Sequence, residues 1–166
     1  MTRILPLALL IAAVGTGVSA AGPATPADRA FVAKVSQGGM FEVAAGKLAE
    51  TRGSTQDVRD FATSEVHDHT LVGARLKAIS TSEGVAIAAA PTAEFAAKLA
   101  RLSHLSGTAF DAAYLTEMAA LHDADGAAFA QEATGGGSAA YRVFGTETHR
   151  IVQRHIGAIH GAPLPR

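Results

Sequence analysis

Apolar residues recur at helical intervals over most of this 166-residue sequence, and this periodicity limits its fold more than any other feature. In the first stretch they are Phe31, Val35, Met40, Val43 and Leu48. Hydrophobic residues make up 48% of the chain but aromatic residues only 5%, so much of the apolar content is alanine. Because alanine is the best helix former, the sequence predicts an all-α fold.

Capping signals divide the periodic stretches into helices. Thr25, Pro26 and Asp28 have the order of a capping box with proline at the first helical position, which predicts a helix start there. Ser54 and Asp57 repeat the signal and predict the start of a second helix. Inside the first helix, the glycine pair 38–39 predicts a close helix contact or a bend.

The second half of the chain is predicted to follow a long link. Residues 85–91 lack a helix start and are expected to form an extended crossover. Thr92 is expected to cap a third helix, which breaks at Ser106 and Gly107 and then continues to Thr134. Thr108 and Asp111 offer a further cap pair after the break.

The last helix is predicted for residues 138–160, with Val143 on its buried side. The whole pattern predicts an all-α, ferritin-like four-helix bundle with a long crossover link and a broken third helix. The bundle domain is assigned to residues 28–160, between a linker at 21–27 and a tail at 161–166.

Residues 1–20 have the features of a cleaved signal peptide. Arg3 precedes an apolar run at 5–14, and Val18-Ser19-Ala20 fits the small-x-small cleavage pattern. The alternative, a membrane anchor, is disfavoured because the run is short and glycines follow it closely. We therefore expect export to the periplasm or cell envelope, with peripheral envelope association, no transmembrane segment after cleavage, and an unknown protein partner.

Composition excludes several classes of function. The chain has no cysteine, which excludes disulfides and thiolate metal sites. Its formal net charge is −1 and no basic block is present, so nucleic acid is not an expected partner. The sequence has no Gly-x-Ser-x-Gly elbow for a serine nucleophile. Enzymatic activity is therefore not the favoured expectation.

Acidic and imidazole side chains lie next to the apolar stripe of each long helix, where they could hold a divalent metal ion inside the bundle. The predicted ligands are Glu42, Asp68, His69, His122 and His155. Glu65 shares a helix face with Asp68 and His69. The Glu-x-x-His pairs of a di-iron bundle are missing, which disfavours a di-iron oxidase.

A second interpretation needs no metal. Asp28, Asp57 and Asp111 are each explained as helix caps. His67 and His69 could belong to a solvated polar face, and His122 and His155 could be neutral histidines satisfied by hydrogen bonds inside the core. The leading hypothesis is thus an exported bundle that binds metal or serves in envelope stress, and the alternative is a structural or protein-interaction bundle of the periplasm.

Several runs of the sequence resemble one family. They are QGGMFEV at 37–43, DVRDFA at 57–62, DHT at 68–70 and LSHLSGTAFDAAYL at 102–115, followed by His122 and His155. Together they are similar to domain-of-unknown-function family 4142, except at Thr148-His149-Arg150. The resemblance implies an exported, ferritin-like helical bundle without an established activity. Its recurrent polar positions correspond to Glu42, Asp68, His69, Asp111, His122 and His155.

Overall fold

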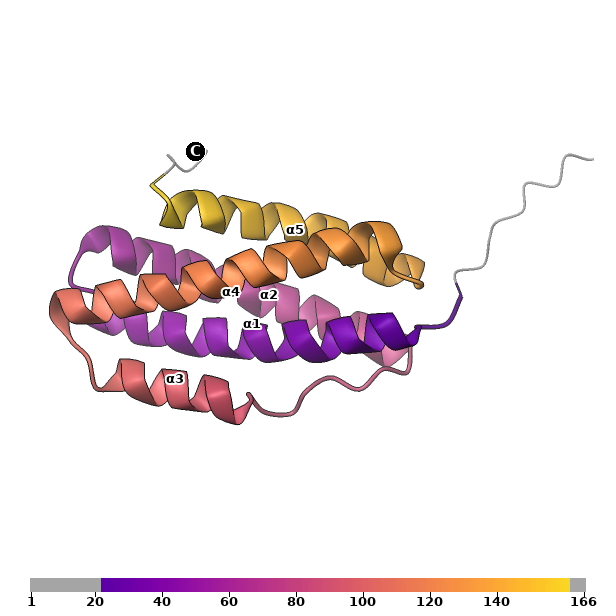
Figure 1. The fold of residues 1–166 in the computed structure, drawn as a ribbon, viewed down its shortest axis with the longest axis horizontal. Coiled ribbons are helices and arrows are strands. Elements are labelled where there is room, and N and C mark those ends of the chain that lie inside the picture. The colour runs from indigo at the N-terminus through magenta and orange to yellow at the C-terminus, as the bar shows by residue number, and fades with distance from the viewer. Residues whose placement is uncertain (1–21, 162–166) are drawn as a thin grey trace, which may run out of the picture.

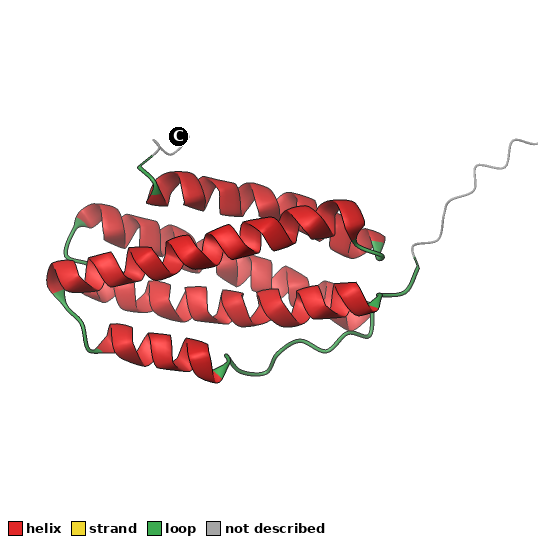
Figure 2. Cartoon of the chain, viewed as in Figure 1, coloured by secondary structure: helices red, strands yellow, loops and turns green. Residues whose placement is uncertain are grey.

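The computed structural model describes residues 22–161, in which all regular secondary structure is helical (Figure 2). The helices are α1 (Pro26–Arg52), α2 (Gln56–Ser82), α3 (Ala93–Ser103), α4 (Gly107–Gly135) and α5 (Ala139–Ile159). The all-α fold is confirmed. The signal peptide predicted for residues 1–20 lies outside the described residues.

Four long helices form the bundle, and α3 lies beside it (Figure 1). The most extensive contacts join α1 with α2 and α4 with α5, so the bundle consists of two helical hairpins. The predicted crossover is present: residues 83–92 run along the bundle from the end of α2 to the start of α3 (Figure 1). None of the described helices is both long and apolar enough to cross a lipid bilayer.

The helix starts are set by local capping. At α1 the predicted capping box is present: Thr25 accepts a hydrogen bond from the Asp28 backbone, and the Asp28 carboxylate accepts one from the backbone of Thr25. At α2 the predicted cap is wrong by one residue, because Thr55 caps the helix by accepting from Val58 N. Ser54 is thereby free to make a tertiary contact.

That contact corrects the interpretation of Asp111 as a helix cap. The Asp111 carboxylate accepts hydrogen bonds from the backbone and the hydroxyl of Ser54, with 2.9 Å between Ser54 N and Asp111 Oδ1. Ser106 is the N-terminal cap residue of α4 and makes no side-chain capping bond. Asp111 therefore ties α4 to the turn between α1 and α2, a role that local sequence cannot reveal.

The structure also differs at the third helix. The chain reverses direction between α3 and α4, so these are two helices rather than one helix with a break (Figure 1). Gly107 allows the reversal because its φ of 59° lies in the left-handed region that side chains disfavour. α3 then lies against α1, where Phe95 stacks on Phe41 with 5.0 Å between ring centroids.

Two apolar clusters make up the core. One contains Phe31, Phe129 and Phe144, whose rings pack edge to face, and the other contains Phe41, Tyr114 and other side chains. The prediction for Val143 is wrong, because this side chain is 51% exposed. The buried stripe of α5 instead passes through Tyr141, Phe144, Gly145, Thr148, Val152 and His155.

Candidate metal centre

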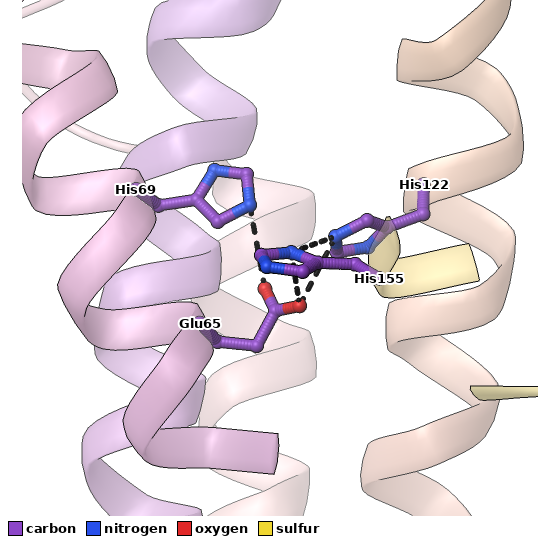
Figure 3. A group of neighbouring side chains, drawn as sticks. All are labelled: Glu65, His69, His122 and His155. Atoms are coloured by element: carbon purple, nitrogen blue, oxygen red, sulfur yellow. Dashed lines mark hydrogen bonds and ion pairs between the residues drawn. The ribbon is translucent and has the colours of Figure 1, made fainter. Parts of the chain in front are cut away.

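A group of buried polar side chains lies in the interior of the bundle (Figure 3). Helix α2 contributes Glu65 and His69, which are four residues apart and so share one helix face. Helices α4 and α5 contribute His122 and His155. Each of the four residues offers one nitrogen or oxygen atom, and these atoms all lie within 4.8 Å of one another. All four side chains are buried.

The Glu65 carboxylate lies at the centre of the group. Its Oε1 atom is 2.7 Å from His155 Nδ1 and 3.2 Å from His122 Nε2, and its Oε2 atom is 3.4 Å from His69 Nε2. His122 Nε2 and His155 Nδ1 are 3.2 Å apart. Despite these short distances, neither Glu65 oxygen has a hydrogen bond of acceptable geometry, and neither does His69 Nε2. The Glu65 oxygens and His69 Nε2 thus lie close to their neighbours without direct hydrogen bonds, whereas His122 Nε2 and His155 Nδ1 are placed to share one if either nitrogen carries a proton.

The outward ring nitrogen of each histidine has its own acceptor. His122 Nδ1 is 2.9 Å from the carbonyl oxygen of Met118. His69 Nδ1 is 2.8 Å from Glu42 Oε2, and His155 Nε2 is 3.0 Å from Asp68 Oδ2. Since a carbonyl or carboxylate oxygen only accepts, these outward nitrogens carry the protons.

This fixes what the inward atoms can do. A neutral imidazole has one N–H group and one lone pair. With the outward nitrogens protonated, the inward nitrogens of His69, His122 and His155 present lone pairs to one another and to the Glu65 carboxylate. Four electron-pair donors facing one small volume require a cation among them, either extra protons on the rings or a metal ion.

The charges of the group favour cations. Burial opposes the charged form of His69, but the nearby Glu42 and Glu65 carboxylates outweigh it and raise the pKa of His69 to about 9. Burial likewise opposes a charged His122, yet Glu65 raises its pKa as well. Burial tends to raise the pKa of Glu65, but the adjacent imidazoles of His122, His155 and His69 outweigh burial and hold it well below the usual value. Without a metal ion, protons on the imidazoles balance the carboxylates.

All five residues predicted as metal ligands lie at this place. His69, His122 and His155 face the common centre, whereas Glu42 and Asp68 contact their outward nitrogens. The central carboxylate, Glu65, was absent from the predicted ligand set. A search for Glu-x-x-His passes over Glu65 and His69, although their spacing of four residues also places them on one helix face.

A further acid lies near the centre. Asp125 is only 2% exposed, and burial together with the Glu42 charge raises its pKa to about 6. Its carboxylate packs against α1 at Gly38, where a Cβ atom would lie 2.8 Å from Asp125 Oδ2. The close helix contact predicted at the glycine pair is thus present, and α1 continues through it without a break.

Comparisons with known proteins agree with the fold. The family model described as "Domain of unknown function (DUF4142)" matches residues 13–161. Among solved structures, the chain is similar to a DUF305 fragment from Deinococcus radiodurans, with a TM-score of 0.74, 18% sequence identity, and coverage of 84% of this chain and 97% of that one. A search of curated proteins finds no significant match. At this low identity the structural similarity shows the fold alone.

Proposed function

We propose that this protein, which belongs to the DUF4142 family, holds one divalent transition-metal ion in the interior of its helical bundle. The ligands are Glu65, His69, His122 and His155. The observation that carries the proposal is the convergence of four buried nitrogen and oxygen atoms within 4.8 Å of one another, while the outward nitrogen of each histidine is held by its own acceptor.

The spacing of these atoms suits a four-coordinate ion. A tetrahedral ion with bonds of about 2.0–2.1 Å separates neighbouring ligand atoms by about 3.3 Å. His122 Nε2 lies 3.2 Å from both Glu65 Oε1 and His155 Nδ1, which is close to that value, and Glu65 Oε1 and His155 Nδ1 are nearer at 2.7 Å. His69 Nε2 lies 3.4 Å from the other Glu65 oxygen, and one atom from each of the four residues lies within 4.8 Å of the rest. Three imidazoles and one carboxylate suit zinc, copper, nickel or iron better than calcium or magnesium.

The surroundings of the ligands support the same proposal. Histidines that bind metals almost always donate their second N–H to a carboxylate or carbonyl, which fixes the ring and makes the ligand more basic. Here Glu42, Asp68 and the Met118 carbonyl are placed to do so. Four protein ligands occupy all four coordination positions of a tetrahedral ion and leave none for a substrate or water. This is typical of structural sites rather than catalytic ones.

We further propose that the protein binds this ion outside the cytoplasm, in the periplasm or cell envelope. The support is the charged, apolar and small-residue pattern of residues 1–20. A site made only of nitrogen and oxygen ligands suits an oxidising compartment, since it contains no thiol to be oxidised.

The competing function is a structural bundle in which protons replace the metal ion. The raised pKa of His69 favours it, because a protonated His69 forms ion pairs with the Glu42 and Glu65 carboxylates, at 2.8 and 3.4 Å. In that case the cluster fixes how the four helices pack, and removing one histidine changes stability but no affinity for metal.

Calorimetric titration of chelator-treated protein with Zn²⁺, Cu²⁺ and Ni²⁺ separates the two functions. We expect one ion per chain for at least one metal. His122→Ala should lose this binding, while the matched control His104→Ala, at an exposed histidine, should keep it. Circular dichroism checks that both variants fold. Absence of binding in the wild-type protein, or equal binding in folded His122→Ala, would contradict the proposal.

A further inference from the structure

The four candidate metal ligands are enclosed by protein, so an ion can reach them only if a side chain moves. Glu65 and His122 are fully buried, and His69 and His155 are 4% and 2% exposed. A buried side chain can turn only where its neighbours leave space, because protein interiors are closely packed. The cavities beside the centre therefore indicate which ligand moves.

A cavity of about 530 Å³ opens beside the centre, between α1, α2 and the crossover. Of the four ligands, only His69 lines it. Its outer edge includes Thr70, Gly73 and Lys77, which are exposed, so the cavity leads to solvent. One water occupies about 30 Å³ of the liquid, so the cavity has room for a turned imidazole and for an ion with its water shell. A second cavity, of about 430 Å³ between α1 and α4, borders none of the four ligands.

The residue one helical turn after His69 is a glycine that packing does not require. Gly73 lies four residues further along α2, and so on the same face, and a Cβ atom there would meet nothing within 4 Å. Glycine inside a helix is destabilising relative to alanine. Side chains on a helix lean back over the preceding turn, so a side chain at position 73 would lie toward the His69 imidazole. Gly73 thus keeps open the space beside this one ligand.

The contacts of the histidines also differ in how firmly they are held. His122 Nδ1 is 2.9 Å from the carbonyl oxygen of Met118, a backbone atom of its own helix. His69 Nδ1 is held instead by the Glu42 side chain, at 2.8 Å from Oε2. The other Glu42 oxygen has no hydrogen bond and lies 3.7 Å from His122 Nδ1. Because Glu42 lines the same cavity, its carboxylate and the His69 imidazole can turn toward the cavity together.

The centre also approaches the surface at Asp68, which contacts His155 Nε2 and is partly exposed. There Arg154 Nη2 lies 3.0 Å from Asp68 Oδ2. An ion approaching from this side would have to displace Arg154 from Asp68, and then Asp68 from His155. On the cavity side only His69 and its partner Glu42 have to move.

We propose that the metal ion enters and leaves the centre through this cavity, and that His69 is the ligand that moves. His69 turns outward into the cavity, a water molecule takes its place on the ion, and the other three ligands stay in position during the exchange. The cavity needs no affinity for cations, and Lys47 and Lys77 at its edge are exposed to water, which weakens their repulsion of a passing ion. This inference rests on the proposed metal site and adds its route of exchange.

Gly73→Leu tests the route, because a leucine there occupies the space into which His69 turns. Stopped-flow measurements follow the loading of chelator-treated protein with Zn²⁺, Cu²⁺ or Ni²⁺, whichever binds in the calorimetric titration, and its removal by excess chelator. We expect both rates to fall about tenfold or more with an unchanged dissociation constant, because an obstacle on the path raises the barrier equally from both sides. Unchanged rates in folded Gly73→Leu, or a change in rate that a changed affinity accounts for, would overturn the proposal.

Two further variants serve as comparisons. Gly135→Leu, at an exposed glycine with an open Cβ position away from this cavity, should exchange metal at the wild-type rate. Arg154→Gln opens the approach at Asp68, and we expect it to change both rates by less than about twofold, as an exposed ion pair has little effect. Faster loading than that in Arg154→Gln would place the entry between α2 and α5 and would overturn the proposal.

Deuterium exchange tests the motion of His69 without a metal ion. The exchanging hydrogen is the one on the ring carbon between the two nitrogens, and mass spectrometry resolves it for each histidine. In chelator-treated protein, Gly73→Leu should slow this exchange at His69 and leave it unchanged at His122, the internal control. Equal exchange at His69 in both proteins would contradict the movement. If the wild-type protein binds no ion, the proposed function fails, whereas unchanged rates in a protein that does bind refute only the route.

Discussion

Glu132 and Asp28 form a carboxyl pair that should make the stability of the bundle depend on pH. The Asp28 carboxylate accepts from Thr25 N at 2.6 Å, Gly137 N at 2.9 Å and Ser138 N at 3.2 Å, which joins the start of α1 to the turn between α4 and α5. Burial disfavours its charge, but these donors lower the pKa of Asp28 to about 2. Burial and the neighbouring Asp28 raise the pKa of Glu132 to about 7.

The raised pKa of Glu132 fixes the sign of the effect. In the unfolded chain Glu132 loses its proton near pH 4.5, whereas in the folded chain it keeps the proton to about pH 7. Between these values the folded state binds more protons, so its stability falls as pH rises. A shift from 4.5 to about 7 corresponds to about 3 kcal/mol at most. Because Glu132 borders a cavity near the surface and faces Arg142, we expect about 1–2 kcal/mol after screening.

Glu132→Gln removes the titration while its amide can still donate to Asp28. Urea unfolding of chelator-treated protein between about pH 5 and about pH 8 measures the free energy of unfolding of both proteins. We expect the variant to gain about 1–2 kcal/mol over the wild type as pH rises through this range. Other titrating groups, including Asp125 and His69, contribute equally to both proteins and cancel in the difference.

The control for this comparison is Asp123→Asn, which removes an exposed carboxylate from the same helix. Its difference from the wild type should stay constant over the same pH range within about 0.5 kcal/mol. A constant difference for Glu132→Gln as well would refute the reasoning, since it would mean that Glu132 has the same pKa in the folded and unfolded chains.

Three further results are expected. Gly46→Ala should destabilise the protein by about 1–3 kcal/mol in urea unfolding, because a Cβ atom there lies 2.8 Å from Val66 Cγ2. Gly73→Ala should instead stabilise the protein by up to about 1 kcal/mol, because a Cβ atom there has no other atom within 4 Å. Equal changes in the free energy of unfolding for Gly46→Ala and Gly73→Ala would contradict both expectations. Asp68→Asn should weaken metal binding about 10–100-fold without abolishing it, since Asp68 orients His155; unchanged affinity would exclude that role.

The sequence predicts helix starts well where capping is local. Thr25 and Thr92 have their partners three residues further along the chain, and both caps are present. The sequence predicts caps poorly where a side chain that fits a local capping pattern bonds to a residue far away in the chain. Ser54 and Asp111 each fit a local cap pattern, yet they bond to each other across 57 positions.

The candidate site follows the same division. Polar residues beside an apolar stripe identify His69, His122 and His155, because each helix face can be read from spacing. Which ring nitrogen faces inward depends on partners from the fold, such as the Met118 carbonyl for His122 and the Asp68 carboxylate for His155. The choice of Glu65 over Asp68 as the central carboxylate also depends on how α2 is rotated against α5, which spacing within α2 does not determine.

The position of a metal ion in crystals of metal-loaded protein tests the central claim most directly. Anomalous scattering at the absorption edge of the bound metal locates the ion without reference to the protein. We predict one peak among Glu65, His69, His122 and His155, at about 2.0–2.3 Å from each ligand atom, with Glu42 and Asp68 bonded only to histidine. A peak elsewhere, an ion bound directly by Glu42 or Asp68, or no peak in fully loaded protein would contradict the claim.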